Sequence, residues 1–101
     1  MSSVKGTKLT LNVPPELEGM EHDLERAFGA AIYKLARNTK KGKWEDLDIN
    51  KCFGLLRGEV DELEEAISEG NTIDAIMEAA DIINFAIICT SISIRDGKNG
   101  A

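Results

Sequence analysis

Apolar residues recur three and four positions apart along most of the chain, a spacing that predicts helices. The first helical segment covers about residues 14–37 and the second about residues 48–69. The third covers about residues 72–95 and is apolar nearly all round after Ala79. The apolar positions of the first two segments are Leu17, Met20, Leu24, Phe28, Ala31 and Leu35, then Cys52, Leu56, Val60, Leu63 and Ile67. We therefore expect an all-α protein.

Two turn-forming residues set how the second and third helices are joined. Gly70 is suited to end the second helix, and Asn71 can cap the start of the third. A turn this short forces the two helices into an antiparallel pair. Gly54 and Gly58 lie inside the second helix, where glycine is unfavourable, so we predict a close approach of another helix at these positions.

The start of the first two helices is also marked. Pro14-Pro15 can open the first helix, although Gly19 weakens its first turn and moves the regular helix a few residues later. Residues 38–48 combine glycine with mixed charge and have no period, which predicts a loop. Asp46 or Asp48 at its end can cap the second helix.

A chain of 101 residues is a single domain by length. We divide it into an N-terminal arm or short strand at 1–13, one helical domain at 14–96, and a flexible tail at 97–101. The third helix has too little polar surface for a three-helix monomer, because two neighbouring helices cannot cover it on all sides. We expect an antiparallel helical bundle that is completed by oligomerisation.

Composition narrows the possible partners and the compartment. The net charge of -6 disfavours nucleic acid and anionic membranes as partners. Residues 82–94 form an apolar run that is too short and too polar to span a bilayer, and no secretory leader opens the chain. Cys52 and Cys89 have no metal-binding spacing and lie in apolar surroundings, which favours buried free thiols. We expect a cytoplasmic protein.

The candidate chemistry lies in four acids on the second and third helices. Glu59 and Glu62 are three residues apart, as are Glu78 and Asp81, so each pair shares one helix face. In an antiparallel hairpin the four carboxylates can converge. Such hard oxygen donors select Mg²⁺, or Mn²⁺, over zinc or iron. A ferritin-like iron site would need histidine beside the acids, and His22 is on another helix.

A simpler interpretation of the acids stays open. Glu59 and Glu62 could belong to a solvated acidic face. Asp81 is flanked by apolar residues, so it needs a positive partner of some kind, either a metal ion or a basic side chain. A lysine or arginine that already neutralises Asp81, or four acids that point to separate places, would speak against an enzyme and leave only a helical oligomer.

Basic and amide side chains supply candidates for substrate binding. A glycine-centred basic loop with an adjacent tryptophan, Trp44, could clamp phosphates and stack on a base, although such loops are often merely solvated. Its cations are Lys34, Arg37, Lys40, Lys41 and Lys43. Asn84 could bind a metal-bound phosphate or water or orient a ligand carboxylate, or it could bond across a helix interface.

At these residues the chain resembles the MazG-like all-α nucleoside triphosphate pyrophosphohydrolases. The family's paired motifs read EVDE at 59–62 and EAAD at 78–81. The resemblance extends upstream to Lys34-Leu35, Asn38, Lys41-Gly42 and Trp44, and downstream through the run EAADIINFA at 78–86. It covers about residues 28–89.

The resemblance implies Mg²⁺-dependent hydrolysis of a (d)NTP to the (d)NMP and pyrophosphate by a homodimer or a dimer of dimers. It implies a metal site made by Glu59, Glu62, Glu78 and Asp81. On this hypothesis Glu59 or Glu62 accepts the proton of the attacking water. Lys34 or Lys41 holds phosphate oxygens, Trp44 and Asn38 contact the base or sugar, and Asn84 also lies at the substrate. A non-catalytic dimerisation or regulatory module, or a nucleotide-binding sensor, is the alternative.

Overall fold

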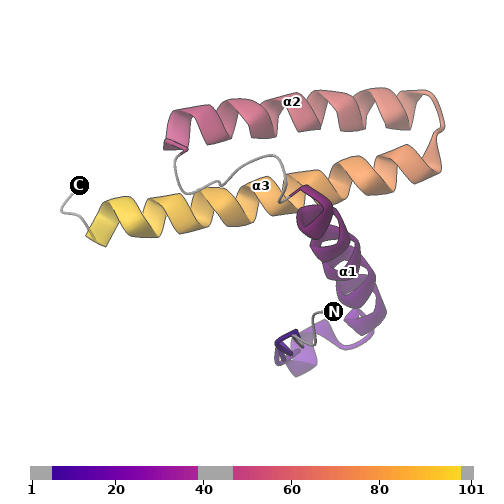
Figure 1. The fold of residues 1–101 in the computed structure, drawn as a ribbon. Helices are drawn as coiled ribbons and strands as arrows, with labels where there is room; N and C mark the ends of the chain where they lie inside the picture. The colour runs from indigo at the N-terminus through magenta and orange to yellow at the C-terminus, as the bar shows by residue number, and fades with distance from the viewer. Residues whose placement is uncertain (1–5, 39–46, 99–101) are drawn as a thin grey trace, which may run out of the picture.

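The computed structural model describes residues 6–38 and 47–98, and these form helices without any strand (Figure 1). A short 3-10 helix, η1, covers Pro15–Leu17 and is followed by α1 at Glu21–Asn38. Helix α2 covers Ile49–Ser68 and α3 covers Thr72–Lys98. The predicted all-α class is confirmed. Residues 6–13 contain no strand, so the short strand considered for 1–13 is absent from the part that the structure describes.

The helix ends follow the predicted capping residues. Asp48 precedes α2, and its Oδ1 accepts a hydrogen bond from the backbone N–H of Lys51 at 2.8 Å. Gly70 ends α2 with a φ of 69°, a left-handed conformation that glycine adopts without strain. Asn71 begins α3, since its Oδ1 accepts from the backbone N–H of Asp74 at 3.1 Å.

Helix α3 is the central element of the fold. Helices α2 and α3 form an antiparallel hairpin, and α1 packs against α3 and crosses it at a steep angle (Figure 1). Near the C-terminal half of α3, Cys52 of α2 is fully buried with Ile88 and Ile92 of α3. The side chain of Asn84 joins α3 to α1, because its Nδ2 donates to the carbonyl of Ala31 at 2.8 Å.

A single chain leaves many of its large apolar side chains exposed. The radius of gyration is 15.7 Å, compared with about 13 Å for a compact chain of this length. Two positions of the predicted α2 core stripe are open, since Val60 is 48% exposed and Ile67 is 63% exposed. The periodicity identified the apolar face correctly, but one neighbouring helix covers only part of it.

The close helix approach predicted at Gly54 and Gly58 is wrong for the single chain. A Cβ atom added at either glycine would meet no atom within 4 Å. These glycines therefore weaken α2 without bringing another helix of the same chain closer.

Helix α3 as a whole is longer than its apolar 82–94 run, since it covers Thr72–Lys98. With 27 residues and a mean hydropathy of 1.6 in its most apolar window, it is long and apolar enough to cross a membrane. The core helix of a soluble protein passes the same test, so this is weak evidence. Only 22% of that window is buried within the chain. The other residues of the window are half-buried or exposed. The cytoplasmic location stays a prediction.

Candidate metal centre

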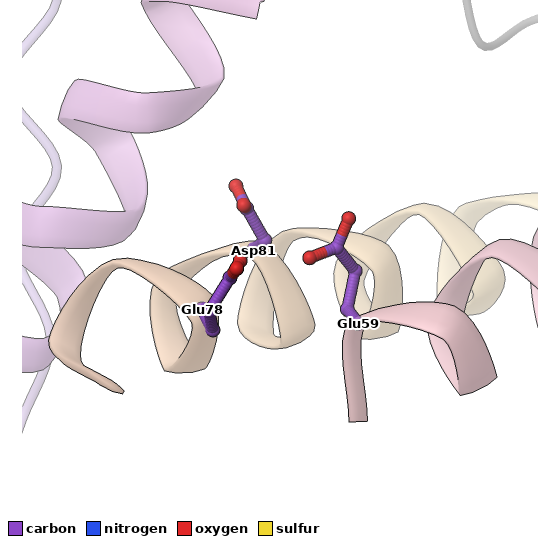
Figure 2. A group of neighbouring side chains, drawn as sticks. All are labelled: Glu59, Glu78 and Asp81. Atoms are coloured by element: carbon purple, nitrogen blue, oxygen red, sulfur yellow. The ribbon is translucent and has the colours of Figure 1, made fainter. Parts of the chain in front are cut away.

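Three of the four predicted acids meet between α2 and α3. Glu59 extends from α2 toward Glu78 and Asp81 of α3 (Figure 2). One carboxylate oxygen of each residue lies within 4.8 Å of the other two, and all three side chains are partly buried. The antiparallel hairpin brings about this convergence, because it places Glu59 of α2 beside Glu78 and Asp81 of α3. Three hard oxygen donors at this spacing could hold one divalent cation.

Glu62 lies at the border of this group. It is exposed, one helical turn after Glu59, and it is not among the three acids whose oxygens gather most closely. Its hydrogen-bonding and charge interactions nevertheless raise the pKa of both Glu59 and Glu78. Glu62 therefore lies close enough to Glu59 and Glu78 to interact electrostatically with an ion bound between them.

Glu59 is the most perturbed of these acids. Burial is the main reason that its pKa rises from 4.5 to about 8, and the neighbouring Glu78, Asp81 and Glu62 raise it further. Its Oε2 is buried and has no hydrogen-bond partner. A protonated Glu59 can donate to Glu78, whereas an ionised Glu59 leaves a buried oxygen without a donor or a cation.

Glu78 is held in a similar environment. Burial raises its pKa, the hydrogen bond with Glu59 lowers it, and Glu62 and Asp81 raise it again. A protonated Glu59 would donate this hydrogen bond and an ionised Glu78 would accept it, so the bond raises the pKa of Glu59 and lowers that of Glu78. Loss of that proton would leave two adjacent anionic carboxylates, which could together bind a cation.

Asp81 already has a basic partner. Lys34 of α1 lies with its Nζ 3.3 Å from Asp81 Oδ2, and both side chains are largely shielded, at 26% and 13% exposed. This is the ion pair that would favour a structural role for Asp81. Among the ion pairs of the described ranges, Lys34 is the one cation paired with these acids. One lysine cannot neutralise three carboxylates, so a negative excess remains at Glu59 and Glu78 when they ionise.

The other residues predicted to bind substrate are not shown to face the acid group. Asn84 is 6% exposed, and its amide bonds to Ala31 across the α1–α3 interface, which is the structural alternative for this residue. Asn38 is the last residue of α1 and is partly buried. Lys41 and Trp44 lie outside the described residues, so their assigned contacts stay predictions.

A hollow near the acids differs from them in chemistry. It has a volume of about 400 Å³ and lies at the α2–α3 turn. It is lined mainly by apolar residues, together with Asn71 and Thr72, and by none of the four acids. Its wall carries no charged side chain that could bind a phosphate.

No family model, curated protein or solved structure matches the chain. The MazG-like assignment therefore rests on the motifs at 34–44, 59–62 and 78–86.

The raised pKa of Glu59 predicts that metal-free protein loses stability as the pH rises. Below about 4.5 the carboxyl group is protonated in both the folded and the unfolded state. Between 4.5 and about 8 the unfolded state releases the proton and the folded state keeps it, so the free energy of unfolding falls. Thermal melts in EDTA should give a lower Tm at pH 8 than at pH 5.5.

Two variants test whether the fall in Tm between pH 5.5 and pH 8 comes from Glu59 or from the overall negative charge of the protein. Glu59→Gln should remove most of the difference in Tm between the two pH values. Glu16→Gln changes an exposed acid of η1 and should leave the difference as it is in the wild type. An equal difference in all three proteins would contradict the assignment to Glu59.

Proposed function

We propose that the protein is a Mg²⁺-dependent nucleoside triphosphate pyrophosphohydrolase whose metal is held by Glu59, Glu78 and Asp81 with Glu62 at the border. The observation that carries this proposal is the convergence of three carboxylates from two helices on one point. Its chemistry agrees with the motif resemblance, which assigns the same acids to the metal.

The residues at this point fit a divalent cation. The buried Oε2 of Glu59 has no hydrogen-bond donor, and its neighbours are further carboxylates rather than donors. Two unit negative charges about 4 Å apart repel by about 4 kcal/mol at an effective dielectric constant near 20. A cation between them converts this repulsion into attraction, and oxygen donors without nitrogen or sulfur favour Mg²⁺ or Mn²⁺.

A bound Mg²⁺ would supply charge neutralisation for a triphosphate and a water molecule of lowered pKa. The protein's own groups have distinct tasks beside it. Glu62 is exposed and adjoins Glu59 and Glu78, so it is placed to accept a proton from water at the site. Glu59 and Glu78 would help to hold the cation, and they would have to be ionised to do so.

Lys34 has a task in substrate binding on this proposal. Its Nζ lies at Asp81 on the α1 side of the acid group, where a phosphate oxygen would approach. If Asp81 held a cation, its ion pair with Lys34 would be broken, and the ammonium group would be available to bind a phosphate oxygen. Lys34 would thus be the counterion of Asp81 without a metal and a phosphate ligand with one.

The proposal includes a homodimer or a dimer of dimers. Its support is the extended shape of the chain and the small buried fraction of α3. A second copy that covers α3 would also shield the neighbouring acids from water, which strengthens their interaction with a cation.

A non-catalytic helical oligomer is the second candidate, and two contacts favour it. The ion pair between Lys34 and Asp81 and the hydrogen bond from Asn84 to Ala31 both fasten α1 to α3. In that case the four acids have no ligand, and neither Mg²⁺ nor a nucleotide affects the protein. A nucleotide sensor would bind and not hydrolyse.

A single panel distinguishes the three functions. The common NTPs and dNTPs are incubated with the protein and Mg²⁺, pyrophosphate is measured, and thermal melts are recorded on the same samples. The enzyme releases pyrophosphate from at least one of them and is stabilised by Mg²⁺. Stabilisation by a nucleotide without pyrophosphate indicates a sensor. No effect of Mg²⁺ or any nucleotide contradicts both and leaves the helical oligomer.

A further inference from the structure

The two cysteines of the chain lie side by side although they are 37 positions apart. Cys52 belongs to α2 and Cys89 to α3, and their Sγ atoms are 2.9 Å apart. A disulfide bond has a length of about 2.05 Å, so the sulfur atoms need to approach by only about 0.9 Å. The hairpin has therefore already brought both thiols to the place where a bond can form.

The surroundings of the pair hold it in the core of the hairpin. Cys52 is 0% exposed and packs with Ile88 and Ile92, and Cys89 and Phe85 pack against the same cluster. The Sγ of Cys52 also lies 3.7 Å from the backbone carbonyl of Phe85, to which it can donate. Packing from both helices leaves the sulfur atoms few alternative positions.

The two thiols differ in their access to an oxidant. Cys89 is partly exposed, whereas Cys52 is fully buried. Burial, the hydrogen bond with Cys89 and the charge of Cys89 raise the pKa of Cys52 to about 12, so Cys52 is a thiol at neutral pH. An oxidant from solution therefore reaches Cys89 first, and Cys52 is the group beside it that can complete a disulfide.

We infer that Cys52 and Cys89 form a reversible dithiol–disulfide site that clamps α2 to α3 when a peroxide oxidises the protein. Hydrogen peroxide converts the Cys89 thiol to a sulfenic acid and releases water. The sulfur of Cys52 then attacks the Cys89 sulfur, the S–O bond breaks, and the hydroxyl group leaves with the Cys52 proton as a second water. Two electrons pass from the thiols to the peroxide, and a dithiol such as dithiothreitol returns them.

The clamp would stabilise the hairpin independently of the acids. A bond between positions 37 apart restricts the unfolded chain strongly, and the expected rise in Tm is on the order of 10 °C. Cys52 precedes Glu59 by seven residues, or roughly 10 Å along α2. The bond therefore holds the two helices together close to the acid group, and its formation does not depend on a metal or a substrate.

The test is oxidation of the full-length protein with hydrogen peroxide, followed by intact-mass measurement, thiol titration and thermal melts. We expect the mass of the single chain to fall by two hydrogen atoms and both titratable thiols to disappear. The Tm should rise and return to its starting value in dithiothreitol. The variant Cys89→Ala should keep its buried Cys52 thiol and gain no stability under the same treatment.

Three results would overturn the inference. The first is a mass that rises by oxygen atoms, because the thiols would then oxidise separately. The second is a covalent link between two chains on a non-reducing gel. The third is loss of two hydrogen atoms without any rise in Tm, which would show that the bond forms but does not clamp the helices. Far-UV circular dichroism of Cys89→Ala verifies that this variant is folded.

Discussion

Replacing Glu59 by glutamine should reduce Mg²⁺-dependent release of pyrophosphate on the order of 100-fold or more while leaving the helices intact. Glutamine has nearly the same volume but lacks the negative charge, and Glu59 is the acid that reaches from α2 to the two acids of α3. The substitution also removes the buried oxygen that has no donor. Metal-free Glu59→Gln protein should therefore melt at a higher temperature than the wild type at pH 8, although it is inactive.

This combination of lost activity and gained stability is specific to a charged ligand site. A residue that only supports the fold would lose both properties together when it is altered. Glu64→Gln is the matched control, because Glu64 is an exposed acid of the same helix and lies outside the acid group. Pyrophosphate release by Glu64→Gln should equal that of the wild type. Full activity in Glu59→Gln would remove Glu59 from the mechanism.

In solution the protein should have two or four times the mass of its 11.0 kDa chain. Helix α3 carries large apolar side chains that the single chain leaves exposed, namely Ile73, Ile76, Ile87 and Ile94. Ile73, Ile87 and Ile94 are separated by multiples of seven residues, so they lie along one side of the helix. A second copy of the chain is the simplest cover for this side. Light scattering coupled to size-exclusion chromatography measures the mass directly.

A charge at the centre of that side should break the oligomer. Ile87→Glu should weaken self-association roughly tenfold or more, because a buried carboxylate without a partner costs several kcal/mol. Ser93→Glu introduces the same charge at an exposed position on another side of α3 and should leave the mass unchanged. A wild-type protein that elutes as a monomer at every concentration would contradict the oligomer.

Local signals in the sequence were sufficient to predict the helices. The caps at Asp48 and Asn71 and the glycine at 70 act within a few residues of themselves, so their effects can be recognised without a tertiary structure. The short turn that these residues define sets the antiparallel register of α2 and α3. That register in turn brings Glu59 to Glu78 and Asp81, which explains why paired acids three residues apart predicted the convergence.

Contacts between distant positions had no such local signal. The spacing of apolar residues shows which face of α2 is apolar but not how much of it a neighbour covers, so Val60 and Ile67 were expected in the core and are exposed. The pairing of Lys34 with Asp81 depends on where α1 crosses α3. The approach of Cys52 to Cys89 likewise depends on the register of the whole hairpin and not on cysteine spacing.

A crystal soaked in Mn²⁺ tests most directly whether the carboxylates of α2 and α3 hold a divalent cation. We predict an anomalous density peak between Glu59, Glu78 and Asp81, at about 2.0–2.2 Å from carboxylate oxygens, with Lys34 turned away from Asp81. A structure without density at that point and with the Lys34–Asp81 ion pair intact would contradict the claim.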